Sequence, residues 1–201
     1  MCYTFTCAEN ISPLQGTKHR QRGIFILCQA TFTKETLRIR PAQSGDLPKI
    51  VEIYNHAVVQ KGATADLTPV SVEDRRQWFA EHESGMYPIW KALTGEAVVG
   101  WCSLSPYRPG RMALRRTAEI SYYVHRDYRG KGVGSALIAH AMTQCAPLDI
   151  TSLFALLLDI NIASIKILEK FGFVRWGHMP DIAEIDGTRC GHLIYGRSVT
   201  E

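Results

Sequence analysis

The sequence predicts a mixed α/β domain whose sheet is mainly antiparallel in its first half and contains a β-α-β unit in its second. Stretches of alternating apolar residues are interleaved with stretches in which apolar residues recur at helical spacing. A Thr94-Gly95 turn joins two strand candidates, which is typical of an antiparallel hairpin. A glycine-rich segment, 129–134, stands between a strand and a helix, as in a β-α-β connection. The element order is therefore β-α-α-β-β-β-α-β-α-β-β.

The first elements are a short strand and two helices. Residues 37–40 alternate as a strand does. Ser44 or Asp46 can cap a helix that runs to about residue 60 with its apolar side chains on one face. A capping-box pattern opens a second helix over 71–82.

Three antiparallel strand candidates follow. Residues 87–93 and 96–104 flank the hairpin turn, and a loop with four arginines covers 106–116. Residues 117–125 alternate again and lead directly into the glycine-rich segment.

The last elements complete the β-α-β unit and add two strands. Apolar residues at helical spacing run from Val133 towards Pro147. The remaining candidates are a buried strand over 153–158, a helix over 161–170 ended by Gly172, a strand that starts over 173–176, and a last strand over 189–197 after an Asp186-Gly187 turn.

The overall composition restricts the class of protein. A chain of 201 residues that is 46% apolar can form one domain with a proper core. The net charge of +4 suits anionic ligands, but the basic residues are scattered, which argues against nucleic-acid binding. No apolar run reaches the roughly 18 residues of a membrane span.

The six cysteines show no C-x-x-C pair and no accompanying histidine cluster, so we expect no metal site. Free thiols of this kind are typical of a reducing cytoplasm, where we expect the protein to act. Residues 1–35 have no sustained period and are expected to form an extension of the domain at 36–201. The extension is interpreted as poorly ordered or as a non-native start; the alternative is a regulatory or oligomerising arm.

The glycine-rich segment predicts a site for phosphate. Glycines at a strand-to-helix junction let backbone N–H groups close around an anion, and the helix N-terminus adds the positive end of its dipole. The segment lacks the G-x-x-x-x-G-K-[ST] spacing of a P-loop. Its glycines also miss the G-x-G-x-x-G spacing of a dinucleotide fold, and its strand comes fourth rather than first.

Four motifs in order resemble the GNAT N-acetyltransferase superfamily over residues 37–197. The branch that the chain resembles most is the phosphinothricin and methionine sulfoximine acetyltransferases, which share its Asn55-His56 pair. The four motifs are Glu119-x-Ser-x-Tyr-Val124, Arg129-Gly-Lys-Gly-Val-Gly134, Asn161-x-Ala-Ser-Ile165 and Phe171-Gly-Phe173.

The resemblance implies a central, mostly antiparallel mixed sheet of about seven strands, flanked by about four helices. It also implies acetyl-CoA as co-substrate and a homodimer. The residues that it assigns to acetyl-CoA are Tyr122, Tyr123, Val124, Arg129, Gly130, Lys131, Gly132, Val133, Gly134, Ser135 and Asn161. For Asn161 the alternative is a helix cap.

Glu119 is the candidate general base. A pantetheine arm laid along the strand reaches back about five residues, roughly 16 Å, from Val124 to Glu119. A substrate ammonium must lose a proton before it attacks a thioester, and a carboxylate can accept that proton through water. The alternatives are that Glu119 only pairs with the ammonium or is solvated. Leu168 stands where many family members carry a tyrosine acid, so the acid is unassigned.

Arg108, Arg111 and His192 are the candidates for acceptor binding. Arginines can pair bidentately with a carboxylate or phosphinate, although a solvated basic loop is the alternative. His192 lies on the last strand, which lines the acceptor side in the resembling fold; the alternative is a structural histidine.

The predicted function is transfer of acetyl from acetyl-CoA to the primary amine of a small molecule, an amino acid or its analogue. The expected partner is therefore a small-molecule amine, without nucleic acid or membrane. The alternatives are a protein N-terminal or lysine acetyltransferase and a non-catalytic acyl-CoA sensor.

Overall fold

The computed structural model describes residues 36–83 and 86–199, and the structural statements below concern these residues. The extension expected at residues 1–35 lies outside them. Seven strands form one sheet in the order β1-β2-β3-β4-β5-β7-β6. The strands are β1 (Arg38–Pro41), β2 (Ile89–Thr94), β3 (Ala97–Pro106), β4 (Thr117–Val124), β5 (Ser152–Leu158), β6 (Val174–Ile185) and β7 (Thr188–Ser198).

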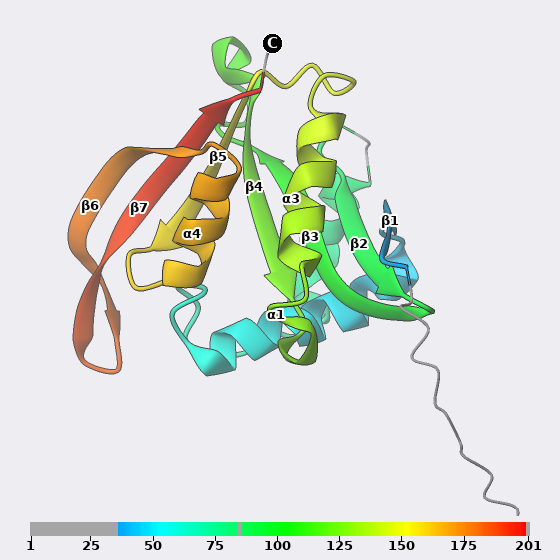
Figure 1. Ribbon diagram of the computed structural model, residues 1–201, viewed down its shortest axis with the longest axis horizontal. Coiled ribbons are helices and arrows are strands. Elements are labelled where there is room, and N and C mark those ends of the chain that lie inside the picture. Colours follow the sequence, from blue (N-terminus) through cyan, green and yellow to red (C-terminus); the bar gives the residue numbers. More distant parts are fainter. Residues whose placement is uncertain (1–35, 84–85, 200–201) are drawn as a thin grey trace, which may run out of the picture. The chain divides into compact units, whose positions relative to one another are not determined.

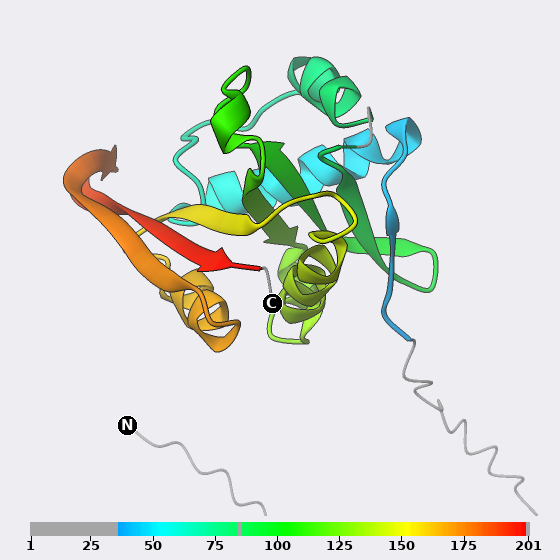
Figure 2. The same cartoon turned by 90° about the horizontal axis from the view of Figure 1, so that it is seen from above.

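Four α-helices cover the two faces of this sheet within the described part of the chain. They are α1 (Leu47–Gln60), α2 (Arg76–His82), α3 (Val133–Gln144) and α4 (Ile162–Lys170). Helices α1 and α2 lie on one face, and α3 and α4 lie on the other (Figure 1, Figure 2). The predicted fold class, a mixed and mostly antiparallel sheet of about seven strands with four helices, is confirmed.

The core is divided between the two faces because successive side chains of a strand point to opposite sides of the sheet. Trp101 is buried against α1 with Ile50 and donates its indole N–H to the Ile50 carbonyl at 3.0 Å. Its neighbour Cys102 is buried on the α3 side, with Leu137. Each helix layer therefore rests on its own apolar surface.

The helix starts follow the local sequence signals. Ser71 Oγ accepts from the Asp74 backbone N–H at 3.1 Å, and the Asp74 carboxylate accepts from the Ser71 N–H at 3.0 Å. This reciprocal pair is the predicted capping box. It opens a 3₁₀ turn, Glu73–Arg75, that runs directly into α2. The expected second helix is thus a 3₁₀ turn followed by a short α-helix.

Strand β6 extends far beyond its predicted start over 173–176. It runs to Ile185 with a register shift between Met179 and Ala183, and most of its side chains are exposed. A strand at the sheet edge with little burial on either face leaves no alternating pattern in the sequence. Pairing with β7 therefore determines its length, which the sequence pattern did not show.

None of the helices in the described residues is both long enough and apolar enough to cross a lipid bilayer.

Candidate active site

The sheet opens at its centre, where β4 and β5 separate. These parallel strands pair at only three positions, from Thr117 with Ser152 to Glu119 with Phe154. Beyond Glu119, β4 pairs with β3 alone, while β5 continues to pair with β7 (Figure 1). The backbone groups of 120–124 that face β5 therefore lack a partner strand within the described chain. Such unpaired N–H and C=O groups can bind a ligand laid between the strands.

A groove with a volume of about 940 Å³ occupies this opening. Its walls are the end of α1, the end of β4, the glycine-rich loop and the start of α4. All but one of the residues predicted to bind acetyl-CoA line it: Tyr122, Tyr123, Val124, Arg129, Gly130, Gly132, Val133, Gly134, Ser135 and Asn161. The exception is Lys131, which is exposed and holds its ammonium 5.0 Å from the centre of the Tyr128 ring.

The glycine loop is held in a conformation that other residues rarely adopt. Gly130 and Gly132 have φ of +72° and +85°, in the left-handed region that favours glycine. Gly132 is the N-cap of α3, so the free N–H groups of that helix start at the groove. A left-handed turn next to a helix N-terminus directs successive N–H groups to one side, which suits a phosphate.

Gly134 serves a different purpose. A Cβ atom at this position would stand 3.2 Å from Ile167 Cδ1 of α4. The missing side chain lets α3 and α4 approach each other across the groove.

Asn161 is both a helix cap and a groove residue. Its side-chain oxygen accepts from the Ser164 backbone N–H at 3.2 Å, at the start of α4. The cap uses the oxygen of the amide and not its NH₂ group. The two roles expected of Asn161 are therefore compatible.

Glu119 lies at the point where the strands separate and is partly buried. Burial raises the pKa of its carboxyl above the ordinary value, and a hydrogen bond with the Ser121 hydroxyl opposes part of that shift. Ser121 and Tyr123 lie on the same face of β4 because side chains alternate along a strand. A carboxylate with a raised pKa is better matched to accept a proton near neutral pH.

A second cavity, of about 160 Å³, lies on the α1 and α2 side of the sheet. Its lining residues are Ile50, Val51, Tyr54, Arg75, Trp78, Trp101, Ser103, Ser105, Ser121 and Tyr123. Tyr123 lines both this cavity and the large groove. It is thus the side chain that the two cavities have in common.

Arg75 provides the positive charge of the small cavity. Its guanidinium lies 3.2 Å from a carboxylate oxygen of Asp66 and 4.9 Å from the centre of the Tyr54 ring. The Tyr54 hydroxyl donates to the same Asp66 oxygen at 2.5 Å. These contacts hold Arg75 at the cavity wall, where it can pair with an anionic group.

The sequence interpretation missed this small cavity. Its signal is a polar stripe, because Ser103 and Ser105 follow Trp101 on one face of β3 and Ser121 lies on the same face of β4. Serines in the central strands of a covered sheet are unexpected in a face that packs a core.

His82 is a further residue that the sequence interpretation did not identify. It is buried, and its Nδ1 lies 2.6 Å from the Trp78 carbonyl oxygen, so Nδ1 carries the proton and donates. Nε2 then accepts from the Ser105 hydroxyl at 3.1 Å. Ser105 is directly opposite Glu119 across the β3–β4 pair. His82 and Ser105 thus place polar groups on the strand next to the candidate base.

The predicted acceptor residues lie away from both cavities. Arg108 and Arg111 are exposed and line a separate shallow hollow in the β3–β4 loop. His192 is on β7, opposite Leu158 of β5 and Met179 of β6, and is not among the lining residues of either cavity. Their role in acceptor binding stays a prediction.

Leu168, at the position of the usual tyrosine acid, is fully buried in the core. It offers no proton donor to the groove. Burial raises the pKa of the Tyr122 phenol, a groove residue, to about 12.

Comparison with known proteins relates this geometry to a family. The family model described as an acetyltransferase (GNAT) domain matches residues 36–174. YwnH of Bacillus subtilis is 39% identical over 165 residues, which cover 82% of this chain and 100% of that protein. The L-methionine sulfoximine/L-methionine sulfone acetyltransferase of Pseudomonas paraeruginosa is 36% identical over 148 residues, covering 73% of this chain and 85% of the relative.

A solved structure is similar over the same region. The phosphinothricin acetyltransferase of Sinorhizobium meliloti in complex with acetyl-CoA has a TM-score of 0.76 and 30% identity. The match covers 81% of this chain and 88% of that one.

Proposed function

Because this chain belongs to the GNAT acetyltransferase family, we propose that it transfers an acetyl group from acetyl-CoA to the primary amine of an amino acid or an amino-acid analogue. The observation that carries the proposal is the separation of β4 and β5 at Glu119. Near this point lie a groove that suits acetyl-CoA, a carboxylate that can act as the general base and a small cavity that suits an amine.

The donor binds with its pyrophosphate against the glycine loop. The N–H groups at Gly130, Gly132 and the start of α3 neutralise the phosphates, and Arg129 adds a positive charge. The pantetheine arm lies along the unpaired edge of β4 and brings the thioester towards Glu119. Fixing the donor in this way makes the reaction effectively unimolecular once the amine is bound.

The amine attacks the thioester carbonyl directly within the ternary complex. Glu119 accepts the ammonium proton, through water, and so frees the nitrogen lone pair. Unpaired N–H groups of β4 stabilise the negative oxygen of the tetrahedral intermediate. Collapse of the intermediate breaks the C–S bond and releases CoA as a thiolate. A thiol with a pKa near 8.5 leaves without a dedicated acid, which is consistent with Leu168.

The small cavity supports a small acceptor. Its volume of about 160 Å³ favours a compact acceptor such as a free amino acid. Arg75 can pair with the acceptor carboxylate, and the serines can bind its ammonium or side chain. Phosphinothricin and methionine sulfoximine are acceptors of this size and charge.

The free and buried state of Cys102, Cys145 and Cys190 supports action in a reducing cytoplasm. A homodimer is expected from the family resemblance, and light scattering after gel filtration tests it.

A thiol-release assay tests the proposal. Purified protein and acetyl-CoA are mixed with methionine sulfoximine, phosphinothricin, aromatic amino acids or polyamines, and each amino acid is paired with its decarboxylated amine. We expect thiol release with one or more amino acids and much less with the matched amine, because the amine has no carboxylate for Arg75 to bind. Tight CoA binding without thiol release from any amine would instead indicate an acyl-CoA sensor. Release with peptides but not with free amino acids would indicate a protein acetyltransferase.

A further inference from the structure

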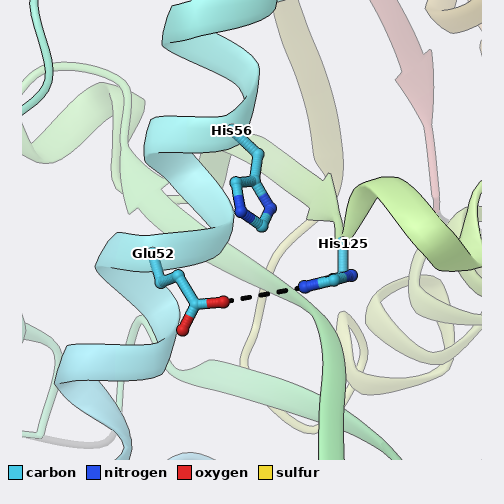
Figure 3. A group of neighbouring side chains, drawn as sticks. All are labelled: Glu52, His56 and His125. Atoms are coloured by element: carbon cyan, nitrogen blue, oxygen red, sulfur yellow. Dashed lines mark ion pairs between the residues drawn. The ribbon is translucent and has the colours of Figure 1, made fainter.

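Three side chains with metal-binding atoms converge beside the donor groove. Glu52 and His56 are one helical turn apart on α1, so they point to the same side. His125 follows β4 and faces both of them (Figure 3). One ligand atom of each residue lies within 4.8 Å of those of the other two. His125 Nε2 is 3.6 Å from Glu52 Oε1, and the two imidazole rings meet edge to face with centroids 4.7 Å apart.

His56 has a buried ring nitrogen without a hydrogen-bond partner. This atom, Nδ1, is buried and has no partner among the described residues. A buried, unpaired polar atom is costly, and native proteins usually satisfy it with a protein group, a water or an ion.

Asp127 lies behind His125, on the side of the ring away from Glu52 and His56. His125 Nδ1 accepts from the Asp127 backbone N–H at 3.3 Å and lies 3.7 Å from the Asp127 carboxylate. In this tautomer Nε2 carries the proton, so metal binding at Nε2 moves the proton to Nδ1, which then gives up the Asp127 N–H and can donate to that carboxylate. A carboxylate behind a ligating histidine fixes the ring and increases its basicity.

We propose that Glu52, His56 and His125 bind a divalent transition-metal ion such as Zn²⁺, which ties α1 to the segment that leads into the donor loop. Two imidazoles and one carboxylate suit Zn²⁺, Ni²⁺ or Cu²⁺ and not Mg²⁺ or Ca²⁺, which require mainly oxygen ligands. Tetrahedral ligands about 2.0–2.1 Å from zinc are about 3.4 Å apart, so atoms that now lie within 4.8 Å of one another need to approach by up to about 1.4 Å. Water fills the remaining coordination position.

The surroundings allow this approach. Glu52 is exposed, and its carboxylate accepts from the Lys49 ammonium, whose side chain is 38% exposed, at 2.6 Å. Exposed ion pairs of this kind contribute little to stability, so Glu52 can exchange Lys49 for the metal. Rotation of the Glu52 side chain requires no change in the core.

The ion would link α1 to the segment after β4, which form two walls of the donor groove. Ala57, the neighbour of His56, and Tyr128 both line the groove. The Tyr128 and His125 rings are 5.9 Å apart. The metal site is thus separate from the groove, but both are built on α1 and the segment after β4. The inference does not depend on the proposed function, because metal binding requires no acetyl transfer.

Zinc affinity measured against a chromophoric chelator tests the proposal on the full-length, chelator-treated protein. Glu52→Gln, His56→Asn and His125→Asn are each expected to weaken Zn²⁺ binding by at least tenfold, since loss of an outer partner alone costs roughly 10- to 100-fold. His178→Asn is the matched control: His178 is 39% exposed and lies 3.7 Å from an Asp159 carboxylate oxygen, but is outside the cluster. It should bind Zn²⁺ as the parent protein does.

Free thiols bind Zn²⁺, and residues 1–35 contain three cysteines, so a Cys2→Ser, Cys7→Ser and Cys28→Ser variant is included as a control. It should keep its affinity, and Co²⁺ bound to it should show no thiolate charge-transfer absorption. Zinc should also raise the Tm of the parent protein, and this rise should be lost in Glu52→Gln, whose exposed position leaves folding intact. The proposal is overturned if the cysteine variant loses binding or if all three cluster variants bind Zn²⁺ as the parent does.

Discussion

Glu119 and Phe154 form the last parallel pair between β4 and β5, and the sheet opens immediately beyond them. The candidate base lines neither cavity itself: it lies three residues before Tyr122, the first β4 residue of the donor groove, and Tyr123, on the same face of β4 as Glu119, lines both the groove and the small cavity. One irregularity in strand pairing thus brings the donor, the base and the acceptor cavity together.

Replacement of Glu119 by Gln should lower kcat by about 10²- to 10⁴-fold, the usual contribution of a general base. The KM for acetyl-CoA should change little, because the groove residues are untouched. Burial raises the pKa of Glu119, so the acid limb of the parent pH–rate profile should lie at a higher pH than an ordinary glutamate gives. Steady-state kinetics between pH 5 and 9 measure both effects. Near-parental turnover of Glu119→Gln at every pH would falsify the assignment.

The same substitution should stabilise the protein at neutral pH. Because the folded-state pKa of Glu119 is raised above 4.5, the folded state holds this proton more tightly than the unfolded state. Its contribution favours folding at low pH and is lost as pH rises through the unfolded and then the folded pKa. Glu119→Gln removes the ionised, partly buried group, so its Tm should exceed that of the parent at pH 7. The difference should disappear near pH 4, where scanning calorimetry can test it.

The elements that could be predicted from sequence are those with a local signal. The donor loop is a continuous motif, since the positive φ of Gly130 and Gly132 requires glycine at fixed positions. The capping box at Ser71 and Asp74 is likewise contained in four residues. In such cases the chemistry and the spacing are both visible in one short segment.

The small cavity and the histidine cluster could not be predicted in the same way. Arg75 reaches the cavity from the turn before α2, whereas Ser105 and Ser121 come from two strands. His56 and His125 are brought together by the packing of α1 against the end of β4. Only the tertiary fold determines these distances, because the residues lie far apart in the sequence.

Gly132→Ala should weaken acetyl-CoA binding more than it weakens folding. Alanine at φ +85° costs about 1–2 kcal/mol, and relief of that strain would turn the loop N–H groups away from the phosphates. The Kd for acetyl-CoA, measured by calorimetry, should rise by about tenfold or more. Gly45→Ala is the control, because Gly45 is outside the positive-φ region and a Cβ atom there has no neighbour within 4 Å. Equal Kd values for the two variants would contradict the anion-binding role of the loop.

Arg75→Gln should raise the KM for amino-acid acceptors while leaving the KM for acetyl-CoA unchanged. A hydrogen bond to a charged group contributes about 1.5–3 kcal/mol, which corresponds to roughly 10- to 100-fold in KM. The effect should be small for the decarboxylated amine, because that substrate has no carboxylate for Arg75 to bind.

The neighbouring Arg76→Gln is the matched control for this prediction. Arg76 is exposed and pairs with Glu73, and it is not among the residues that line the small cavity. It should therefore leave both KM values unchanged. If Arg75→Gln raised the KM of an amino acid and of its decarboxylated amine equally, Arg75 would be shaping the cavity through Tyr54 and Asp66 rather than binding the carboxylate. If neither KM changed, the acceptor would bind elsewhere, and the exposed Arg108 and Arg111 would be the next residues to replace.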